Sequence, residues 1–314
     1  TIIGMYNGNV TCSGSGGTVN LISSFISSIT GSSYKLNVYD CEVTNAFYIY
    51  TGSVKGNIID RLVVSSGGTT GDTLRIMGNY MTSLDWNSGS VYFEICNNYI
   101  DGQASSSYSS RPVTIDGLQA TPGGTNLFAN NTINYQSGYN DQTCSYNGNS
   151  YSDNIGGIVF FSQVQNGQNL VIANNYIRNT TSSSYGWAIS VTNNNHSISN
   201  ALIANNFYSA CDLSFGSMFT NSSLVDNGTS SVSWTYSSTT GIIASSSAVN
   251  QGLDQIEYRD INNTRNDIGT SGGPHAWSNY NTTTGKAAVF NLELPFQLYI
   301  GGNHNIKAKG FHKN

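Results

Sequence analysis

Short runs of alternating apolar and polar residues recur along the chain. Each run ends in a corner pair, mostly Gly-Asn or Asn-Asn, and a further apolar residue follows. Alternation with a period of two predicts β-strands, and Asn or Gly at a fixed position predicts a sharp bend in left-handed backbone geometry. The clearest segments are GSVKGNII at 52–59, LRIMGNYM at 74–81, FEICNNYI at 93–100, NLFANNTI at 126–133, LVIANNYI at 170–177 and ALIANNFY at 201–208. The segment LNVYDCEV at 36–43 fits more loosely, and Val225-Asp226-Asn227 adds a further candidate corner.

The spacing of these corners matches the turns of a solenoid. The second corner residue falls at positions 41, 57, 79, 98, 131, 175 and 206. The intervals are therefore 16, 22, 19, 33, 44 and 31 residues, and the longer ones leave room for an insertion or for a second coil. Such a repeat indicates stacked units that bury a shared core, because one coil alone is too thin to be stable.

Aligning the corners produces two columns of large apolar residues. Three residues before the corner stand Val38, Val54, Ile76, Ile95, Phe128, Ile172 and Ile203. Two residues after it stand Val43, Ile59, Met81, Ile100, Ile133, Ile177 and Tyr208. We expect both columns to face inward, so the pattern predicts an all-β parallel β-helix. We also expect the corner side chains Asn98, Asn131, Asn175 and Asn206 to stack and to exchange amide hydrogen bonds between coils.

The outward positions of the same strands change character along the chain. They lie four and two residues before the corner, and most of them are polar in the N-terminal coils. In the C-terminal coils they are apolar, namely Leu127, Ala129, Val171, Ala173, Leu202 and Ala204. A solvated strand does not carry such a surface, so something should cover it. The candidates are an inserted loop or the C-terminal tail of the same chain, and an interface with a partner chain or ligand.

A stretch near the C-terminus carries a family resemblance. Residues 258–269 read Tyr-Arg-Asp-Ile-Asn-Asn-Thr-Arg-Asn-Asp-Ile-Gly, and Gly272-Gly273-Pro274 follow. This stretch resembles the closing motif of bacterial (Bacteroidetes-type) secreted β-helix proteins, with Asn262-Asn263 in place of the usual Asp-Gly. The resemblance implies a right-handed parallel β-helix of the pectate-lyase-like superfold and an extracytoplasmic location, but no single activity. We interpret Arg259, Asp260, Arg265 and Asp267 as a structural ion-pair and turn network.

These patterns give an expected domain organisation. Residues 1–285 form the β-helix, with long loop insertions at 101–125 and 134–157 and the closing motif at 254–274. Residues 286–314 form a C-terminal strand hairpin or the start of a small β module.

Composition narrows the classes of function. Only 9% of residues are charged, the formal net charge is −5, and 12 Lys and Arg cannot form a dense phosphate-binding surface, so a nucleic-acid partner is not expected. The chain contains no run of about 18 apolar residues, so the sequence predicts no membrane span. The five cysteines lack a Cys-x-x-Cys spacing and the four histidines form no metal-spaced pair, so we expect neither a metal nor a cofactor. The cysteines could equally be buried thiols or two disulfides plus one thiol.

Candidate catalytic residues are few. By the alignment, Lys55, Arg75 and Glu94 stack on neighbouring coils and form the only outward charged column. A lyase acting on a uronate polymer could use them, although simple cross-strand charge pairs explain them too. Asp60 and Asp101 share an outward column with Thr82 between them. Two strand spacings, about 10 Å, separate the two carboxylates, which is the edge of the range that glycoside hydrolysis requires.

The expected function is therefore a secreted or surface-exposed structural protein without catalytic activity: a stalk, an adhesin or a filament subunit. Its expected partners are other copies of itself or a surface polysaccharide. One alternative is a polysaccharide lyase or glycoside hydrolase acting on an extracellular polysaccharide, and a second is a viral tail spike.

Overall fold

The structure is a computed structural model of the whole chain. It describes residues 1–13, 16–31, 34–66, 71–102, 111–119, 123–135, 144–146, 149–151, 156–160, 170–180, 187–191, 198–209, 211, 219–220, 222–225, 227–229, 235–236, 243–244, 248–260, 262–277, 287–293 and 307–312.

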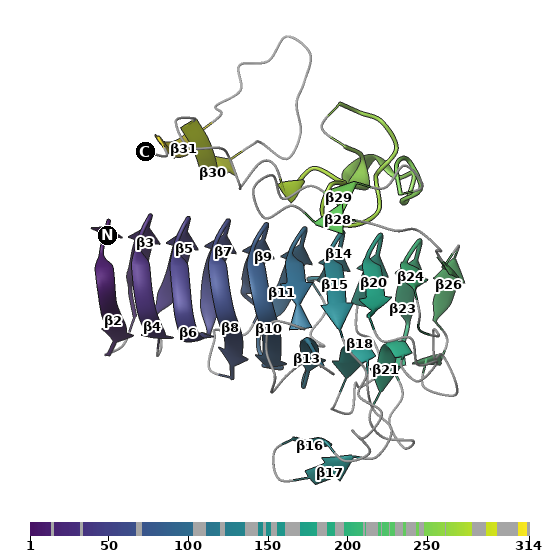
Figure 1. Cartoon of the computed structure of the whole chain (residues 1–314), viewed down its shortest axis with the longest axis horizontal. Coiled ribbons are helices and arrows are strands. Elements are labelled where there is room, and N and C mark those ends of the chain that lie inside the picture. The colour runs from purple at the N-terminus through teal and green to yellow at the C-terminus, as the bar shows by residue number, and fades with distance from the viewer. Residues whose placement is uncertain are drawn as a thin grey trace.

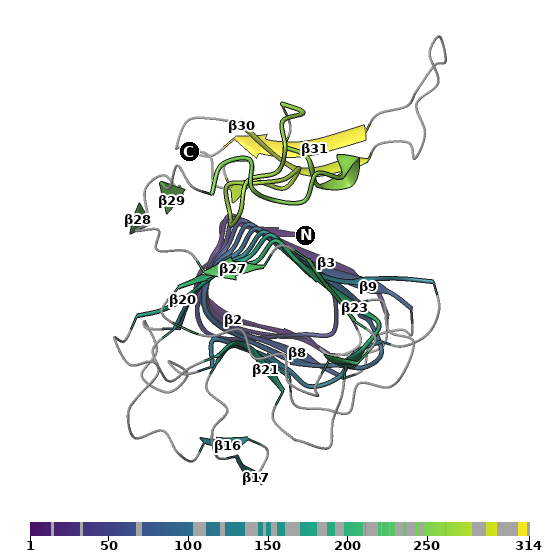
Figure 2. The same ribbon diagram turned by 90° about the vertical axis from the view of Figure 1, so that its right-hand side faces the viewer.

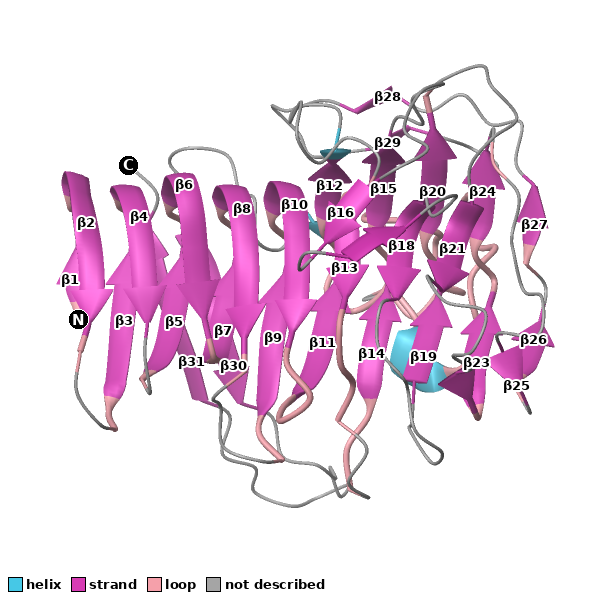
Figure 3. Ribbon diagram, turned by 90° about the horizontal axis from the view of Figure 1, so that it is seen from below, coloured by secondary structure: helices cyan, strands magenta, loops and turns pink. Residues whose placement is uncertain are grey.

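The described chain is all-β, with two long sheets of parallel strands (Figures 1 and 3). The first sheet has ten strands in the order β1 (Ile2–Ile3), β3 (Thr18–Ile22), β5 (Lys35–Tyr39), β7 (Thr51–Lys55), β9 (Thr73–Met77), β11 (Tyr92–Cys96), β14 (Asn126–Ala129), β19 (Leu170–Ala173), β23 (Ala201–Ala204) and β26 (Ser223–Val225). Every pairing within it is parallel.

The second sheet runs beside the first. Its main path is β2 (Tyr6–Cys12), β4 (Phe25–Gly31), β6 (Glu42–Ile49), β8 (Ile58–Ser65), β10 (Tyr80–Asn87), β12 (Tyr99–Asp101), β15 (Thr132–Tyr135), β20 (Tyr176–Asn179), β24 (Phe207–Ser209) and β27 (Gly228–Thr229). A branch from β10 continues through β13 (Val113–Ile115), β18 (Gly156–Phe160) and β21 (Trp187–Val191). The chain alternates between the two sheets, which is consistent with a parallel β-solenoid, and one strand from each sheet plus the corner between them is called a coil below.

The remaining elements are small. They are the pairs β16 (Cys144–Tyr146) with β17 (Asn149–Tyr151), β22 (Ile198–Ser199) with β25 (Phe219–Thr220), β28 (Thr235–Tyr236) with β29 (Ile243–Ala244), β30 (Ala287–Glu293) with β31 (Lys307–His312), and the 3-10 turn η2 (Ile256–Tyr258). The last strand pair is antiparallel, as the predicted C-terminal hairpin requires.

The core fills the space between the two sheets. All seven residues of the predicted column before the corner are fully buried, and six of the seven after it are at most 1% exposed. Tyr208 is the exception, since it is only partly buried. Two predicted columns therefore merge into one continuous hydrophobic interior.

The four cysteines whose side chains are described are thiols and form no disulfide among themselves. Burial raises the pKa of Cys41 to about 12, and the same cause raises the pKa of Cys96 further. These two residues therefore act as small apolar core groups.

Residues 248–277, called the strap below, leave the stacked coils and return across their corners. Figure 1 shows the strap in green along one edge of the C-terminal coils, and Figure 2, a view along the axis, shows it lying on the corner between the two sheets. The strap is the feature that positions the candidate site.

Candidate functional site

The predicted asparagine ladder is present at atomic detail. The side-chain oxygen of Asn131 accepts hydrogen bonds from the backbone N–H and the side-chain amide of Asn98, both at 3.0 Å. Asn131 in turn donates to the side-chain oxygen of Asn175 at 3.0 Å, and Asn175 to that of Asn206 at 2.9 Å. The series also extends in both directions, from Cys41 through Asn57 and Asn79 at one end to Asn227 at the other. Every coil between Cys41 and Asn227 is thus linked to the next by its corner.

The first residue of each corner pair has a different task. Asn97, Asn130, Asn174 and Asn205 have φ between 51° and 57°, which turns their side chains away from the core. Asn130 donates to Asn266 Oδ1 at 2.7 Å and to the Asp267 carbonyl at 2.8 Å.

The other three first-corner asparagines bond the strap in the same way. Asn97 donates to the carbonyls of Thr270 and Gly272, Asn174 accepts from the Leu253 N–H at 2.8 Å, and Asn205 donates to the Gln251 carbonyl at 3.1 Å. Four successive coils therefore hold the strap through one side chain each.

The closing-motif residues stabilise the strap itself. Asp260 accepts a hydrogen bond from the Gly273 N–H at 2.6 Å, and Asp267 accepts one from the Asn250 N–H at 2.8 Å. Arg259 forms an ion pair with Asp254 at 2.9 Å, and Arg265 donates to the Gly252 carbonyl at 2.6 Å. All four side chains thus bond within residues 250–273, in agreement with the turn-network interpretation.

The apolar outward columns differ in how far the chain itself covers them. Ala129, Ala173 and Ala204 are 2%, 0% and 0% exposed, so the chain already buries them and they offer no surface to a partner. Their column lies two residues from the corner, on the side where the strap docks. Leu127, Val171 and Leu202, two residues farther along their strands, are half-buried, and their role as an interface stays a prediction.

The charged residues considered for a lyase lie close together but not in one column. Arg75 is directly paired with Glu94 across strands, and their side chains form an ion pair at 2.7 Å. Lys55 instead pairs with Met77, so the expectation of a single charged column is wrong: Lys55 lies two residues farther along its strand than Ser53, the register partner of Arg75. Both charges of the ion pair are partly exposed, which makes it a weak stabilising contact.

The strap adds a residue to this cluster that sequence reasoning missed. His275 is half-buried and senses the charges of Lys55, Glu94 and Arg75. Burial lowers its pKa below the ordinary value, with Lys55 and Arg75 acting in the same direction and Glu94 against it. Burial also lowers the pKa of Lys55, helped by Arg75 and opposed by Glu94. No sequence signal pairs position 275 with strands two hundred residues earlier.

Asp60 and Asp101 lie on the outer face of the second sheet, as predicted. Thr82 stands between them in register and donates a hydrogen bond to Asp60 Oδ1 at 3.0 Å. Asn134 donates to Asp101 Oδ1 at 3.1 Å. Burial raises the pKa of the neighbouring Tyr80 to about 12, and the charge of Asp101 and a hydrogen bond with it add to the shift. Both carboxylates are therefore held in place by neutral neighbours.

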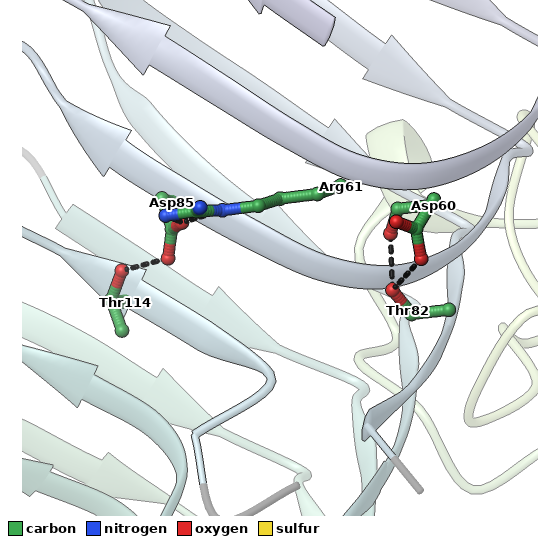
Figure 4. A network of polar contacts seen from close by, with 5 residues as sticks. All are labelled: Asp60, Arg61, Thr82, Asp85 and Thr114. Carbon is green, nitrogen blue, oxygen red and sulfur yellow. Dashed lines mark hydrogen bonds and ion pairs between the residues drawn. The ribbon is translucent and has the colours of Figure 1, made fainter. Parts of the chain in front are cut away.

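A second polar network lies farther along the same strands, and Figure 4 shows it. Arg61 bonds Asp85 through two nitrogens, at 2.6 and 2.7 Å, and Thr114 donates to the other carboxylate oxygen at 2.7 Å. The Asp85 side chain on β10 is 3% exposed, and groups on the two flanking strands, β8 and β13, compensate its charge. This arrangement is structural, because all of its groups bond one another and none is left for a ligand.

An unexpected aromatic column runs beside the corner on the second sheet. It consists of the outward residue directly after each corner, and register pairs place ten residues in it: Tyr6, Phe25, Glu42, Ile58, Tyr80, Tyr99, Thr132, Tyr176, Phe207 and Gly228. Six of them are aromatic. A sequence signal for this column exists, since the residue after the corner is often Tyr or Phe.

The described residues contain no group of three or more His, Cys, Asp and Glu side chains arranged to hold a metal ion. No helix in the described part of the chain has the length and apolar character needed to cross a membrane.

Comparison with known proteins identifies no relative: no family model matches the chain, and no curated protein or solved structure is significantly similar to it.

Proposed function

We propose that this chain is a non-catalytic structural protein exposed outside the cell, folded as a right-handed parallel β-helix of the bacterial secreted type. It acts as a rigid element of a stalk, an adhesin or a filament, with copies of itself or a surface polysaccharide as partners. The observation that carries the proposal is the corner ladder, which links consecutive coils from Cys41 to Asn227. A buried, directional hydrogen bond at every coil resists bending and sliding of one coil on the next.

The strap supports the same role. Four corner asparagines bond it across four coils, so it braces the C-terminal half of the rod along its length. A strap that is fixed to four coils in this way favours a load-bearing role over one that requires conformational change.

Rigidity is directly measurable. Fluorophores attached at Thr18→Cys and Ser223→Cys, two exposed sites on β3 and β26, lie eight strand spacings apart, or about 38 Å. Replacing Cys12 and Cys144 by Ser restricts labelling to these sites. We expect one narrow distance distribution that persists in denaturant until cooperative unfolding. A broad distribution in buffer would contradict a rigid rod.

A polysaccharide lyase is the second candidate, and one observation favours it. The strap brings His275 near Lys55, Arg75 and Glu94. A neutral imidazole base then lies beside two cations that could bind the carboxylate of a uronate. A screen on uronate polymers, followed by absorbance of the unsaturated product, separates the two proposals. Turnover that Arg75→Ala abolishes while the fold is kept would overturn the structural assignment.

A further inference from the structure

The aromatic column is divided into a covered and an uncovered half. Tyr99 and Tyr176 are 3% and 4% exposed, and they pack with Ile268 and Trp277 of the strap in one cluster. In the N-terminal coils, Tyr6 is 83% exposed and Ile58 is 53% exposed. The strap therefore occupies one half of a continuous row and leaves the other half open to solvent.

The open half is an ordered platform. The rings of Tyr6 and Phe25 are stacked, with centroids 5.4 Å apart and planes inclined by 27°. Tyr80 and Tyr99 repeat this stack at 5.5 Å and 22°, where the strap begins to cover the row. Three strand spacings, about 14 Å, separate Phe25 from Tyr80, and Ile58 fills part of the interval. The side chains are held by strand register, so a ligand would meet them already positioned.

Polar groups border the platform. The next outward positions on the same strands are hydroxyl, amide and carboxylate groups, among them Ser27, Asp60 and Thr82. Ser27 is bonded to Asn7 at 3.1 Å, and Thr82 to Asp60. A row of aromatic and aliphatic faces beside a row of hydrogen-bonding groups fits a ligand that is apolar on its face and hydroxylated at its rim.

The charged side chains near the platform indicate which of these ligands it would bind. The charged groups of the open half that face the platform are acidic: Glu42 in the row itself, and Asp60 beside it. An anionic polymer would be repelled there, and the basic cluster of Lys55 and Arg75 lies on the other sheet. A neutral glycan meets no such penalty, and its sugar rings present apolar C–H faces to aromatic rings and hydroxyls to polar neighbours.

We propose that the open half of the aromatic column, from Tyr6 to Tyr80, binds a neutral polysaccharide chain lying along the solenoid axis. Tyr6 and Phe25 form one stacking position, Tyr80 forms the next, and Ile58 contacts the sugar between them. The bordering hydroxyl and carboxylate groups accept or donate hydrogen bonds at the sugar rim. The site is independent of the structural role proposed above, because a rod that binds no glycan remains a rod.

The test is a titration of the whole chain with hexasaccharides of neutral β-linked glucose, xylose and mannose, followed by calorimetry, with a uronate hexasaccharide alongside. We expect binding to at least one neutral ligand, and a loss of affinity of about tenfold or more in the Tyr6→Ala/Phe25→Ala variant. Tyr48→Ala is the matched control: Tyr48 is a 38% exposed tyrosine on the same sheet, paired with Val63 outside the column, and its loss should leave affinity unchanged.

Three results would overturn the proposal. They are no binding to any of the neutral hexasaccharides, preferential binding of the uronate, and equal losses in Tyr6→Ala/Phe25→Ala and Tyr48→Ala. Sedimentation of the same variants addresses the competing occupant: self-association that disappears only with Tyr6→Ala/Phe25→Ala would assign the platform to a second copy of the chain. Circular dichroism and the labelled-rod measurement show in each case whether the variant is folded, so a failure to bind is separable from a failure of the structural role.

Discussion

The N-terminal and C-terminal coils use the same second corner residue but different first ones. Gly56 and Gly78 precede the ladder residue in the N-terminal coils, with φ of 66° and 64°, whereas Asn130 and Asn174 precede it in the C-terminal coils, with φ of 56° and 57°. Both residue types adopt left-handed geometry, so the bend is the same. Only asparagine adds donors and acceptors outside the bend, and the first-corner side chains that bond the strap are asparagines. The choice of Gly or Asn as the first corner residue thus decides whether a corner is only a turn or also a position where the strap is bound.

The largest effect on stability should come from the asparagine ladder, which the N-terminal and C-terminal coils share. Asn79→Ala and Asn131→Ala each remove a buried side chain that bonds two neighbouring coils, and each leaves a backbone N–H without a partner. We expect each to lower the free energy of unfolding by roughly 3 to 5 kcal/mol, measured by urea denaturation. Asn20→Ala, at an exposed inter-coil bond, is the control and should cost less than about 1 kcal/mol. A large effect in only one half would mean that the ladder is not equally important throughout.

The next largest effect on stability should be confined to the C-terminal coils, where the strap docks. A Cβ on Gly272 would lie 2.0 Å from the Asp267 carbonyl oxygen, so Gly272→Ala must displace the strap backbone. We expect a loss of roughly 2 to 3 kcal/mol, with increased exposure of Trp277 detected by its fluorescence. Gly228→Ala is the control, since a Cβ there meets no atom within 4 Å. Unchanged Trp277 fluorescence in Gly272→Ala would show that the strap tolerates the shift.

Exchanging the corner types tests the comparison itself. Asn130→Gly keeps the left-handed bend but removes the bonds to Asn266 and Asp267, so hydrogen exchange of the Gly252 and Gly269 amides should accelerate by about ten- to a hundredfold. Gly78→Asn introduces an asparagine at a corner whose residue has no side chain to bond the strap, and exchange of the Gly252 and Gly269 amides should stay as it is. Equal protection in wild type and Asn130→Gly would remove the first corner residue from the explanation.

Acid should loosen the strap slightly. The folded-state pKa of His275 is lowered, so protonation is harder in the folded state than in the unfolded state. Stability from this group is present above the ordinary histidine pKa and is lost as pH falls through that value toward the folded one. We expect faster strap exchange, after correction for intrinsic rates, at pH 5.5 than at pH 7.5. The difference should shrink in His275→Gln, and a pH response that this variant retains would assign it elsewhere.

The smallest effect should come from an ion pair at the surface of the N-terminal coils. Arg75→Ala breaks a partly exposed ion pair with Glu94, so the free energy of unfolding should fall by about 1 kcal/mol or less. Raising the salt concentration in the denaturation experiment should reduce even this difference. A salt-independent loss several times larger would mean that Arg75 has a packing role.

Much of the architecture was readable in the sequence because its cause is local. Alternation fixes which side of a strand faces the core, and Asn or Gly fixes where the bend occurs, so Val54, Phe128 and Asn131 could be placed without coordinates. The candidate site was less predictable. Lys55 was placed in the same column as Arg75 because both positions face outward, but they differ by two residues along the strand and so belong to different columns. His275 and Trp277 could not be placed at all, since no periodic pattern extends into the strap.

The sequence by itself determined the all-β class, the corner positions, the two inward columns and the asparagine ladder, because each follows from the period of two and from left-handed backbone preferences. Only the tertiary structure decided that residues 248–277 return across four coils, where Ile268 and Trp277 pack with Tyr99 and Tyr176 of the aromatic column. The physical reason is the distance along the chain: contacts between Asn97 and Gly272 or between Tyr99 and Trp277 join segments more than 170 residues apart, and such contacts depend on shape and unmet hydrogen bonds rather than on any local pattern.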